Sequence, residues 1–336
     1  MAAPRWSGLM KYLPLLPVYA AYIILLLLGL YLPGMWQMVA LVLFYAAVGQ
    51  AFNVFIGMTR YVDFGYVAFI ALGSYGMAIA ISRLAAFPQL GVGIIAIGLI
   101  LGVVMAVLLS IAVGGVALRL RGAYFAIATI GVSEGFRYFI DGAKIWGGSE
   151  GIIFSRQLKE VFGPTANSLS TFWADVLVLL IAIVAAFVTI HYMRTRVGYA
   201  LTALREDEDA AKVMGINVTK YKIIAFVTSA AFAGLIGASA WALKTTYVFP
   251  ADVFLITYTV EAIVIVMLGG AGTLLGPVVG GLVYGLSKYW LAIALPGYQL
   301  LIFAPALLVI IVTFPQGIVG VVKRKVKGTA LERYIV

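Results

Sequence analysis

Cysteine is absent from this 336-residue chain, and histidine occurs once, at His191. The absence of cysteine excludes disulfides, thiolate chemistry and cysteine metal sites, and a single histidine builds neither a metal centre nor a catalytic triad. Charged residues make up only 11% of the chain, against about 25% in soluble domains. With 64% apolar residues and a mean hydropathy of +1.09, there is too little charge to cover a water-facing surface. Hydrocarbon is the solvent that such a surface fits, so we expect an integral membrane protein.

Motifs of common catalytic and metal sites are also missing. The chain has no Gly-x-x-x-x-Gly-Lys-Ser/Thr phosphate loop, no His-Glu-x-x-His and no Cys-x-x-Cys. We therefore expect no enzyme, no ATP hydrolysis by this chain alone, and no metal or cofactor bound to it. The net charge of +10 would suggest nucleic acid in a soluble protein. Here the basic residues lie mostly in short loops beside apolar spans, which indicates membrane topology and a lipid environment, not nucleic acid.

Apolar runs predict an all-α polytopic bundle of about ten transmembrane helices. The predicted spans are 12–32, 36–57, 64–82, 91–115, 123–140, 173–193, 221–243, 253–268, 273–291 and 298–315. The pair 253–268 and 273–291 is the least regular, because the first is short and the break between them is rich in glycine. Residues 1–32 resemble a signal peptide, but the apolar run is long enough to span and no small-x-small cleavage site follows. We expect a retained first helix.

The positions of lysine and arginine predict the orientation. If the N-terminus is inside and the spans alternate, 16 of the 23 basic residues fall inside and 7 fall outside or within spans. This bias favours cytoplasmic positions for both termini. We expect residues 1–336 to form one transmembrane domain, with an external loop at 141–172, a cytoplasmic loop at 194–220 and a basic cytoplasmic tail at 316–336.

The cytoplasmic loop carries the densest charge in the chain. Residues 199–214 contain no glycine or proline and predict one amphipathic helix, with the charged run 205–209 in its middle. Gly215 stands where a left-handed C-terminal cap is needed, and Asn217 or Thr219 can cap the next span. By shape alone this is either a solvated surface helix or a coupling helix, a rigid cytoplasmic element that a separate motor can push.

The same loop resembles a known family. Asp209, Ala210, Ala211 and, after three more residues, Gly215 are similar to the EAA loop of ABC importer permeases, with Asp in place of the leading Glu. Residues 203–206 and 215–222 resemble more specifically the branched-chain amino acid permeases of the LivH/LivM group, with LivM the closer match. Four further motifs resemble that family in the same order, at 118–129, 147–151, 261–277 and 314–317.

The resemblance implies the permease subunit of an ATP-driven importer for branched-chain or other small amino acids, in a bacterial or archaeal inner membrane. It implies as partners two ATP-binding cassette subunits that hold ATP and magnesium, a second LivH-like permease or a second copy of this chain, and an extracytoplasmic solute-binding protein. The residues expected to couple to the ATPases are Arg205, Glu206, Asp207, Glu208, Asp209, Ala210, Ala211 and Gly215. Candidates for the solute path are Asn53, Tyr66, Glu134, Tyr258 and Glu261.

The sequence departs from the family after the second span. Tyr66 stands where histidine is common, Asp63 where serine is common, and Trp146 where threonine is frequent. Related permeases for urea or short amides share the scaffold, so they stay an alternative. A secondary transporter that works without an ATPase is a second alternative. Such a transporter needs ionisable residues within its spans, and Glu134 and Glu261 leave this possibility open. A membrane-embedded enzyme is a third interpretation, but the sequence offers no catalytic cluster for it.

Ionisable residues within predicted spans are expensive and therefore informative. Glu134 and Arg137 are three residues apart, which favours a structural ion pair over a role in the solute path. Glu261 has no partner nearby in sequence, so we expect it to face another helix or a cavity. Asp63 is expected to cap the helix that follows it, and Lys288 to extend to the membrane surface.

Overall fold

The computed structural model describes residues 12–32, 34–295, 305, 313 and 316–326, and helix dominates all of them. The longer helices are α1 (Leu15–Tyr31), α2 (Trp36–Thr59), α3 (Val67–Leu84), α4 (Val92–Ala117), α5 (Ala123–Ala143), α8 (Ala174–Met193), α9 (Arg196–Glu206), α11 (Val218–Ile236), α14 (Thr257–Gly269), α15 (Gly276–Ala294) and α17 (Gly317–Val326). The shorter ones are α6 (Ser155–Phe162), α7 (Ala166–Ser168), α10 (Glu208–Val213), α12 (Leu243–Thr245) and α13 (Pro250–Val253). Segments η2 (Pro88–Leu90), η3 (Ile145–Glu150) and η4 (Gly163–Thr165) are 3₁₀ turns, and η5 (Leu169–Trp173) and η6 (Gly237–Ala242) are π-helical.

Six helices within the described residues are long and apolar enough to cross a membrane. They are Trp36–Thr59, Val67–Leu84, Val92–Ala117, Ser155–Met193, Val218–Thr245 and Pro250–Gly269. The shorter α1, and α5 and α15 with their ionisable residues, also coincide with predicted spans. The predicted span 298–315 lies almost wholly outside the described residues, and the predicted tail 316–336 is described only as far as α17. The total of about ten spans stays a prediction.

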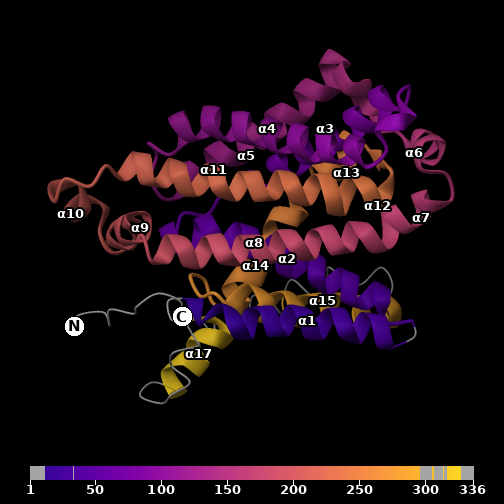
Figure 1. Ribbon diagram of the computed structural model, residues 1–336. Helices are drawn as coiled ribbons and strands as arrows, with labels where there is room; N and C mark the ends of the chain where they lie inside the picture. The colour runs from indigo at the N-terminus through magenta and orange to yellow at the C-terminus, as the bar shows by residue number, and fades with distance from the viewer. Residues whose placement is uncertain (1–11, 33, 296–304, 306–312, 314–315, 327–336) are drawn as a thin grey trace.

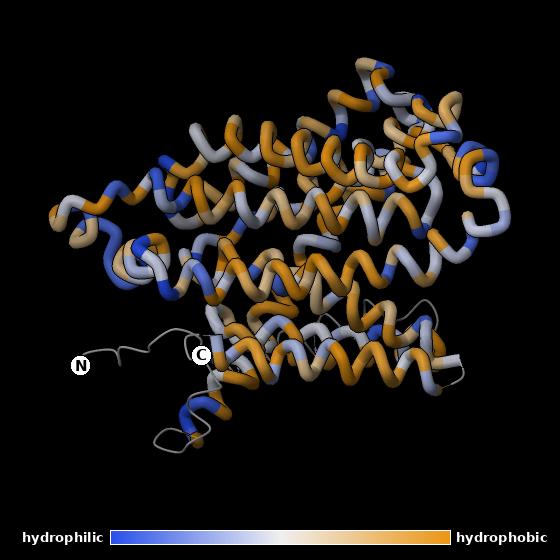
Figure 2. The backbone as a smooth tube through the Cα atoms, in the orientation of Figure 1, coloured by the Kyte–Doolittle hydropathy of each residue, from blue (hydrophilic) through white to orange (hydrophobic). Residues whose placement is uncertain are grey.

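The helices lie side by side in layers, and α2 is enclosed at their centre. It packs against α8, α11, α14 and α15, so nearly all its side chains from 39 onward are buried. In Figure 1, α3, α4 and α5 lie on one side of α11 and α8, and α1 and α15 lie on the other. Figure 2 shows apolar residues along the bundle and polar residues gathered at its two ends, as a membrane-spanning body requires.

Glycines set the spacing where α3, α4 and α11 cross. A Cβ on Gly73 would collide with the carbonyl oxygen of Gly234, and one on Gly76 would collide with the backbone of Gly102. Without side chains at these positions the helix backbones approach closely, which is how membrane helices gain packing contacts when no hydrophobic effect favours their association. These contacts fix the position of α4, one wall of the cavity described below.

The predicted external loop 141–172 folds into short helices and turns. Its two-residue strand β1 (Ile152–Ile153) pairs antiparallel with β2 (Tyr247–Val248), where Ile152 faces Val248. Residues 147–151 spell Gly-x-Ser-x-Gly, but they form a 3₁₀ turn before β1 and not the strand-to-helix elbow that the hydrolase pattern requires. In Figure 1 this loop forms one end of the bundle, hereafter the α6–α7 end.

Candidate functional site

At the opposite end of the bundle, α9 and α10 project as a helical knob (Figure 1). The prediction of one helix over 199–214 is wrong, because Asp207 is extended, with φ −155° and ψ 113°, and separates α9 from α10. Its carboxylate accepts hydrogen bonds from the backbone N–H groups of Asp209 and Ala210, each at 2.9 Å. An aspartate side chain that bonds to nearby backbone competes with the helix and favours a new N-terminus. The charged run therefore lies at an elbow.

Gly215 ends the knob as the sequence predicted. Its φ is +82°, and its N–H bonds to the carbonyl of Lys212 at 2.9 Å. The N–H of Ile216 bonds back to the carbonyl of Ala211 at 3.0 Å, which completes a left-handed glycine cap. Asn217 then caps α11 by accepting from the N–H of Lys220 at 3.1 Å. The turn between α10 and α11 is thus fixed by backbone geometry.

Glu208, the first residue of α10, is the centre of a polar cluster. The Tyr61 hydroxyl donates to Glu208 Oε2 at 2.6 Å, and Lys222 Nζ donates to the same oxygen at 2.7 Å. Lys212 Nζ lies 3.1 Å from Oε1. Burial opposes ionisation of Glu208, but the hydrogen bonds from Lys222, Tyr61 and Lys212 outweigh it and lower the pKa to about 2. The carboxylate is therefore charged at neutral pH.

Lys222 is the most enclosed member of the cluster, with its side chain 1% exposed. Its ammonium lies 3.9 Å from the centre of the Tyr61 ring, in addition to its bond to Glu208. A buried cation needs such partners, because desolvation otherwise disfavours its charge. Lys222 belongs to the first turns of α11, and Tyr61 follows α2. The cluster therefore joins the knob to two separate parts of the bundle.

A third connection comes from Arg121, between α4 and α5. Its guanidinium makes two hydrogen bonds to the carboxylate of Asp209, at 2.9 and 2.6 Å, and its Nε lies 3.7 Å from Glu208. These bonds lower the pKa of Asp209 and raise that of Arg121. Because the pair is exposed to solvent, it adds little stability. The planar guanidinium bonds to both carboxylate oxygens and so fixes the orientation of Asp209.

The predicted coupling residues thus divide into two groups. Glu208, Asp209 and the buried Ala211 face the rest of the chain, and Arg205 reaches inward to the carbonyl of Gly57 at 3.4 Å. Of the predicted coupling residues, Glu206, Asp207, Ala210 and Gly215 are exposed, and so is Asp209, although its carboxylate is bonded to Arg121.

Other exposed residues and contacts of the knob were not predicted from the sequence. Two apolar side chains are exposed at its tip, Val213 at 86% and Met214 at 82%. Their exposure follows from the break at Asp207, which a single amphipathic helix does not include. The anchors Tyr61, Arg121 and Lys222 were also missed, because they are distant in sequence from one another.

Among the solute-path candidates, Asn53 has a structural partner. Its amide nitrogen donates to the carbonyl of Thr273 at 3.0 Å, and its amide oxygen accepts from the N–H of Gly272 at 2.9 Å. Asn53 is fully buried in α2. The side chain therefore satisfies the backbone of the glycine-rich turn between α14 and α15, which would otherwise carry unpaired polar groups in the bundle.

Glu261 faces another helix, as expected. Its carboxylate bonds to the ammonium of Lys288 on α15, which also donates to the Tyr45 hydroxyl at 2.6 Å. Lys288 is thus bonded to two neighbouring helices and 27% exposed, whereas the sequence predicted that it extends to the membrane surface. Tyr258, one turn before Glu261, packs edge-on against Trp241 at 4.8 Å. Both candidates on α14 therefore belong to helix–helix contacts.

Tyr66 belongs to a buried non-helical segment between α2 and α3. The segment is held by threonines from other helices: Thr129 of α5 accepts from the N–H of Phe64 at 3.2 Å, and Thr259 of α14 accepts from the N–H of Val67 at 3.0 Å. Asp63 accepts from the N–H of Gly65 at 2.9 Å, so it makes a local turn and does not cap α3, whose N-cap position is Tyr66. Irregular backbone that is buried inside a helical bundle requires such partners.

Glu134 forms the expected contact with Arg137, at 3.6 Å on α5. The two glutamates of the candidate path therefore belong to separate ion pairs. The α5 face around Glu134 is open: a Cβ added at Gly131 or Gly135 would meet nothing within 4 Å, and Tyr138 is exposed. An ion pair on an open face of a membrane helix is expensive if that face meets hydrocarbon.

The long apolar helices and the polar knob at one end of the bundle are those of a multi-pass helical membrane protein. The chain belongs to the branched-chain amino acid transport system permease component family, whose model matches residues 17–312. This confirms the resemblance found in the sequence.

The curated relatives include two LivM permeases named for high-affinity branched-chain amino acid transport. The one from Salmonella typhimurium is 27% identical over 88% of this chain and 72% of its own length, and that from Escherichia coli is 28% identical over the same shares. BraD of Pseudomonas aeruginosa is 25% identical over 82% of this chain and 91% of its own. No solved structure matches.

Proposed function

We propose that this chain is the permease subunit of an ATP-driven importer for branched-chain or other small amino acids, in the inner membrane of a bacterium or archaeon. Family membership and the relatives' names support the solute class. The observation that supports coupling to an ATPase is that Glu208 and Asp209 anchor α10 to the rest of the chain. ATP and magnesium are held by two separate ATPase subunits, since this chain has no phosphate loop.

The knob is on the cytoplasmic side, with both chain termini. The loops after α2 and α4 lie beside it, because Tyr61 and Arg121 contact α10. These loops carry Arg60, Arg119 and Arg121. Further basic residues lie in the knob and directly beside it. Positive charge collected at one end supports this orientation. The α6–α7 end then faces outward, where the solute-binding protein delivers its cargo.

The tip of the knob contacts an ATPase subunit. Val213 and Met214 are apolar and exposed at the end of a polar projection, where they gain by burial against a partner. The anchored side of α10 transmits a displacement into α11 through Lys222 and into the α4–α5 connection through Arg121. A helix fixed on one side and exposed on the other is suited to transmit a push.

The solute path lies along α5, between this chain and a second permease. The open face with Gly131, Gly135 and the Glu134–Arg137 pair supports this, because charge favours water or protein over lipid. The same scaffold with urea or a short amide as solute is the alternative within the family. In a transporter that works without an ATPase, the anchoring of α10 to the bundle would have no function.

The test uses the full transporter reconstituted in liposomes with its ATPases and binding protein. Val213→Asp with Met214→Asp should reduce ATPase retention on the permease and lower ATP-dependent leucine uptake by about tenfold, since about 1.4 kcal/mol of lost contact changes an equilibrium tenfold. The matched control is Val213→Leu with Met214→Leu, which keeps an apolar tip. Full ATPase retention and uptake in the aspartate variant would exclude the tip as the contact. Uptake without nucleotide would favour the secondary transporter.

A further inference from the structure

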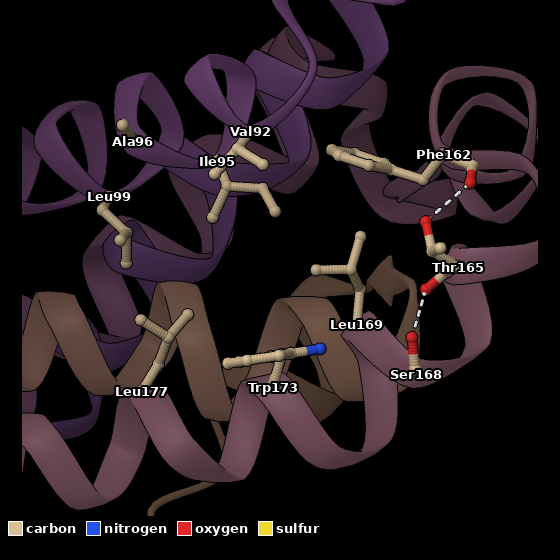
Figure 3. A pocket seen from close by; sticks show the side chains of 10 residues that line it. All are labelled: Val92, Ile95, Ala96, Leu99, Phe162, Thr165, Ser168, Leu169, Trp173 and Leu177. Carbon is tan, nitrogen blue, oxygen red and sulfur yellow. Dashed lines mark hydrogen bonds between the residues drawn. The ribbon is translucent and has the colours of Figure 1, made fainter.

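An apolar cavity lies between α4 and the continuous helix of η5 and α8, toward the α6–α7 end (Figure 3). Its volume is about 480 Å³, within the range of about 300–1,000 Å³ typical of small-ligand sites. Val92, Ile95 and Leu99 line it from α4. Leu169, Trp173 and Leu177 line it from the opposite wall. The cavity is separate from the polar knob and from α5.

The two walls are matched apolar stripes that face each other across a space. The α4 residues are spaced by three and four positions and those of the continuous η5–α8 helix by four, so each set lies on one face of its helix. Such stripes normally pack directly, with axes about 8–10 Å apart. Here α4 is held on α3 and α11, and α8 is held chiefly on α2. Neither wall is free to close the gap.

The lining of the cavity is almost wholly apolar. Among the described residues that line it, none is charged. Thr165 donates its hydroxyl to the carbonyl of Phe162 at 2.7 Å, and Ser168 donates to the carbonyl of Thr165 at 2.8 Å (Figure 3). Both hydroxyl donors are therefore already used by the local backbone. Water would find few partners here, and apolar cavities of this kind exclude it.

The surface around the opening identifies the neighbour. Val92 and Trp173, which line the cavity, are themselves 71% and 52% exposed. The 26 residues of α4 include no ionisable side chain, and the exposed positions of α8 beyond the cavity are Leu180, Val184, Phe187 and, near its other end, His191. This face contrasts with the charged face of α5. It is a surface for hydrocarbon, with a tryptophan near one end, where membrane interfaces favour that residue.

We propose that the cavity is a lipid site that holds one acyl chain of a membrane phospholipid between α4 and α8. The chain contacts both apolar stripes at once, whereas a lipid on the open surface of the bundle contacts one helix face. Van der Waals contacts with two walls instead of one make this lipid exchange more slowly than its neighbours. The lipid also completes the packing that α4 and α8 do not make directly.

The first test compares two tryptophan substitutions on α4. Ala96 lines the cavity, whereas the next residue, Ile97, is exposed on the open face of the same helix. Purified full chain is washed extensively in detergent and its remaining phospholipid is counted by mass spectrometry. Wild type and Ile97→Trp should retain about one phospholipid per chain, and Ala96→Trp should lose it. Equal retention in all three, or no retained lipid in wild type, would overturn the proposal.

The second test leaves the cavity intact. The full chain is placed in phosphatidylcholine bilayers whose acyl chains carry bromine, which quenches tryptophan on contact, and is then moved to unbrominated lipid. The part of the fluorescence that Trp173→Phe removes should stay quenched at least tenfold longer than the rest. Immediate recovery, or quenching of that part by aqueous iodide, would show an open surface or a water-filled cavity and would overturn the proposal.

Discussion

Lys222 Nζ lies 2.7 Å from Glu208 Oε2, so the only glutamate of α10 is bonded to a fully buried cation of α11. The contact links the exposed knob to the helix that continues through the bundle. It is also enclosed by the Tyr61 ring, which shields it from water. A displacement of α10 therefore cannot leave α11 unaffected unless this pair breaks.

Replacing Lys222 with methionine tests that link. Breaking a buried pair by removing one partner costs about 3–5 kcal/mol, and here the cost should be lower, because Glu208 keeps Tyr61 and Lys212. We expect lower thermal stability and less uptake per ATP hydrolysed in the reconstituted transporter. Lys220→Met is the control, since Lys220 is exposed two residues earlier. If both variants couple equally well, Lys222 does not transmit motion.

Tyr61→Phe separates the hydrogen bond from the ring. The variant loses the bond to Glu208, worth about 1.5–3 kcal/mol for a charged acceptor, but keeps the ring beside Lys222. We expect a smaller loss of coupling than in Tyr61→Leu, which removes both contacts. Chemical denaturation and the ratio of uptake to ATP hydrolysis measure the two effects. Identical results for both variants would show that the hydroxyl alone matters, and wild-type behaviour of Tyr61→Phe would exclude it.

The pH dependence follows from the lowered pKa of Glu208. A carboxyl whose folded pKa is about 2, below the ordinary value of about 4.3, stabilises the fold fully above the ordinary value and loses this effect as pH falls toward 2. Tyr61, whose pKa burial and Glu208 raise, stays protonated in the same window. The loss of stability caused by Glu208→Gln should thus be the same at pH 5.5 and 7.5. A defect that vanishes at pH 5.5 would mean that wild-type Glu208 is already protonated there.

The Glu261–Lys288 pair should behave as a structural pair. Lys288→Met leaves the buried Glu261 carboxylate without its cation and should destabilise the chain by about 3–5 kcal/mol. Glu261→Gln leaves Lys288, which is 27% exposed, and should destabilise the chain less. The double variant Glu261→Leu with Lys288→Met removes both charges, and we expect most of the stability and the uptake to return. Thermal unfolding in detergent and transport assays measure both. A stable double variant without uptake would place Glu261 on the solute path instead.

Two glycine substitutions distinguish packing inside the chain from contact with a second permease. Gly73→Ala should destabilise the isolated chain, because the new Cβ meets the backbone of Gly234. Gly131→Leu should leave the isolated chain stable, since nothing lies within 4 Å of that position. It should nevertheless weaken permease pairing, which size-exclusion chromatography of the complex measures. Normal pairing of the Gly131→Leu variant would move the subunit contact away from this face of α5.

Local sequence patterns predicted local structure well. The glycine cap at Gly215, the Asn217 cap and the Glu134–Arg137 contact depend on residues a few positions apart, and all are present. Helices coincide with the predicted spans within the described part of the chain. The break at Asp207 was missed because helix periodicity says nothing about a side chain that bonds to its own backbone.

Apolar length and scarce charge therefore determined the class of protein, since a chain that cannot cover a water-facing surface has to fold in lipid. The motifs of the loop and the glycine turns determined its family. Only the tertiary structure decided which ionisable residues pair when they lie far apart in sequence. Tyr61 and Glu208 are 147 residues apart, and Glu261 and Lys288 are 27 apart. Such pairs depend on which helix faces pack together, and the same packing left the apolar space between α4 and α8, which no pattern along the chain encodes.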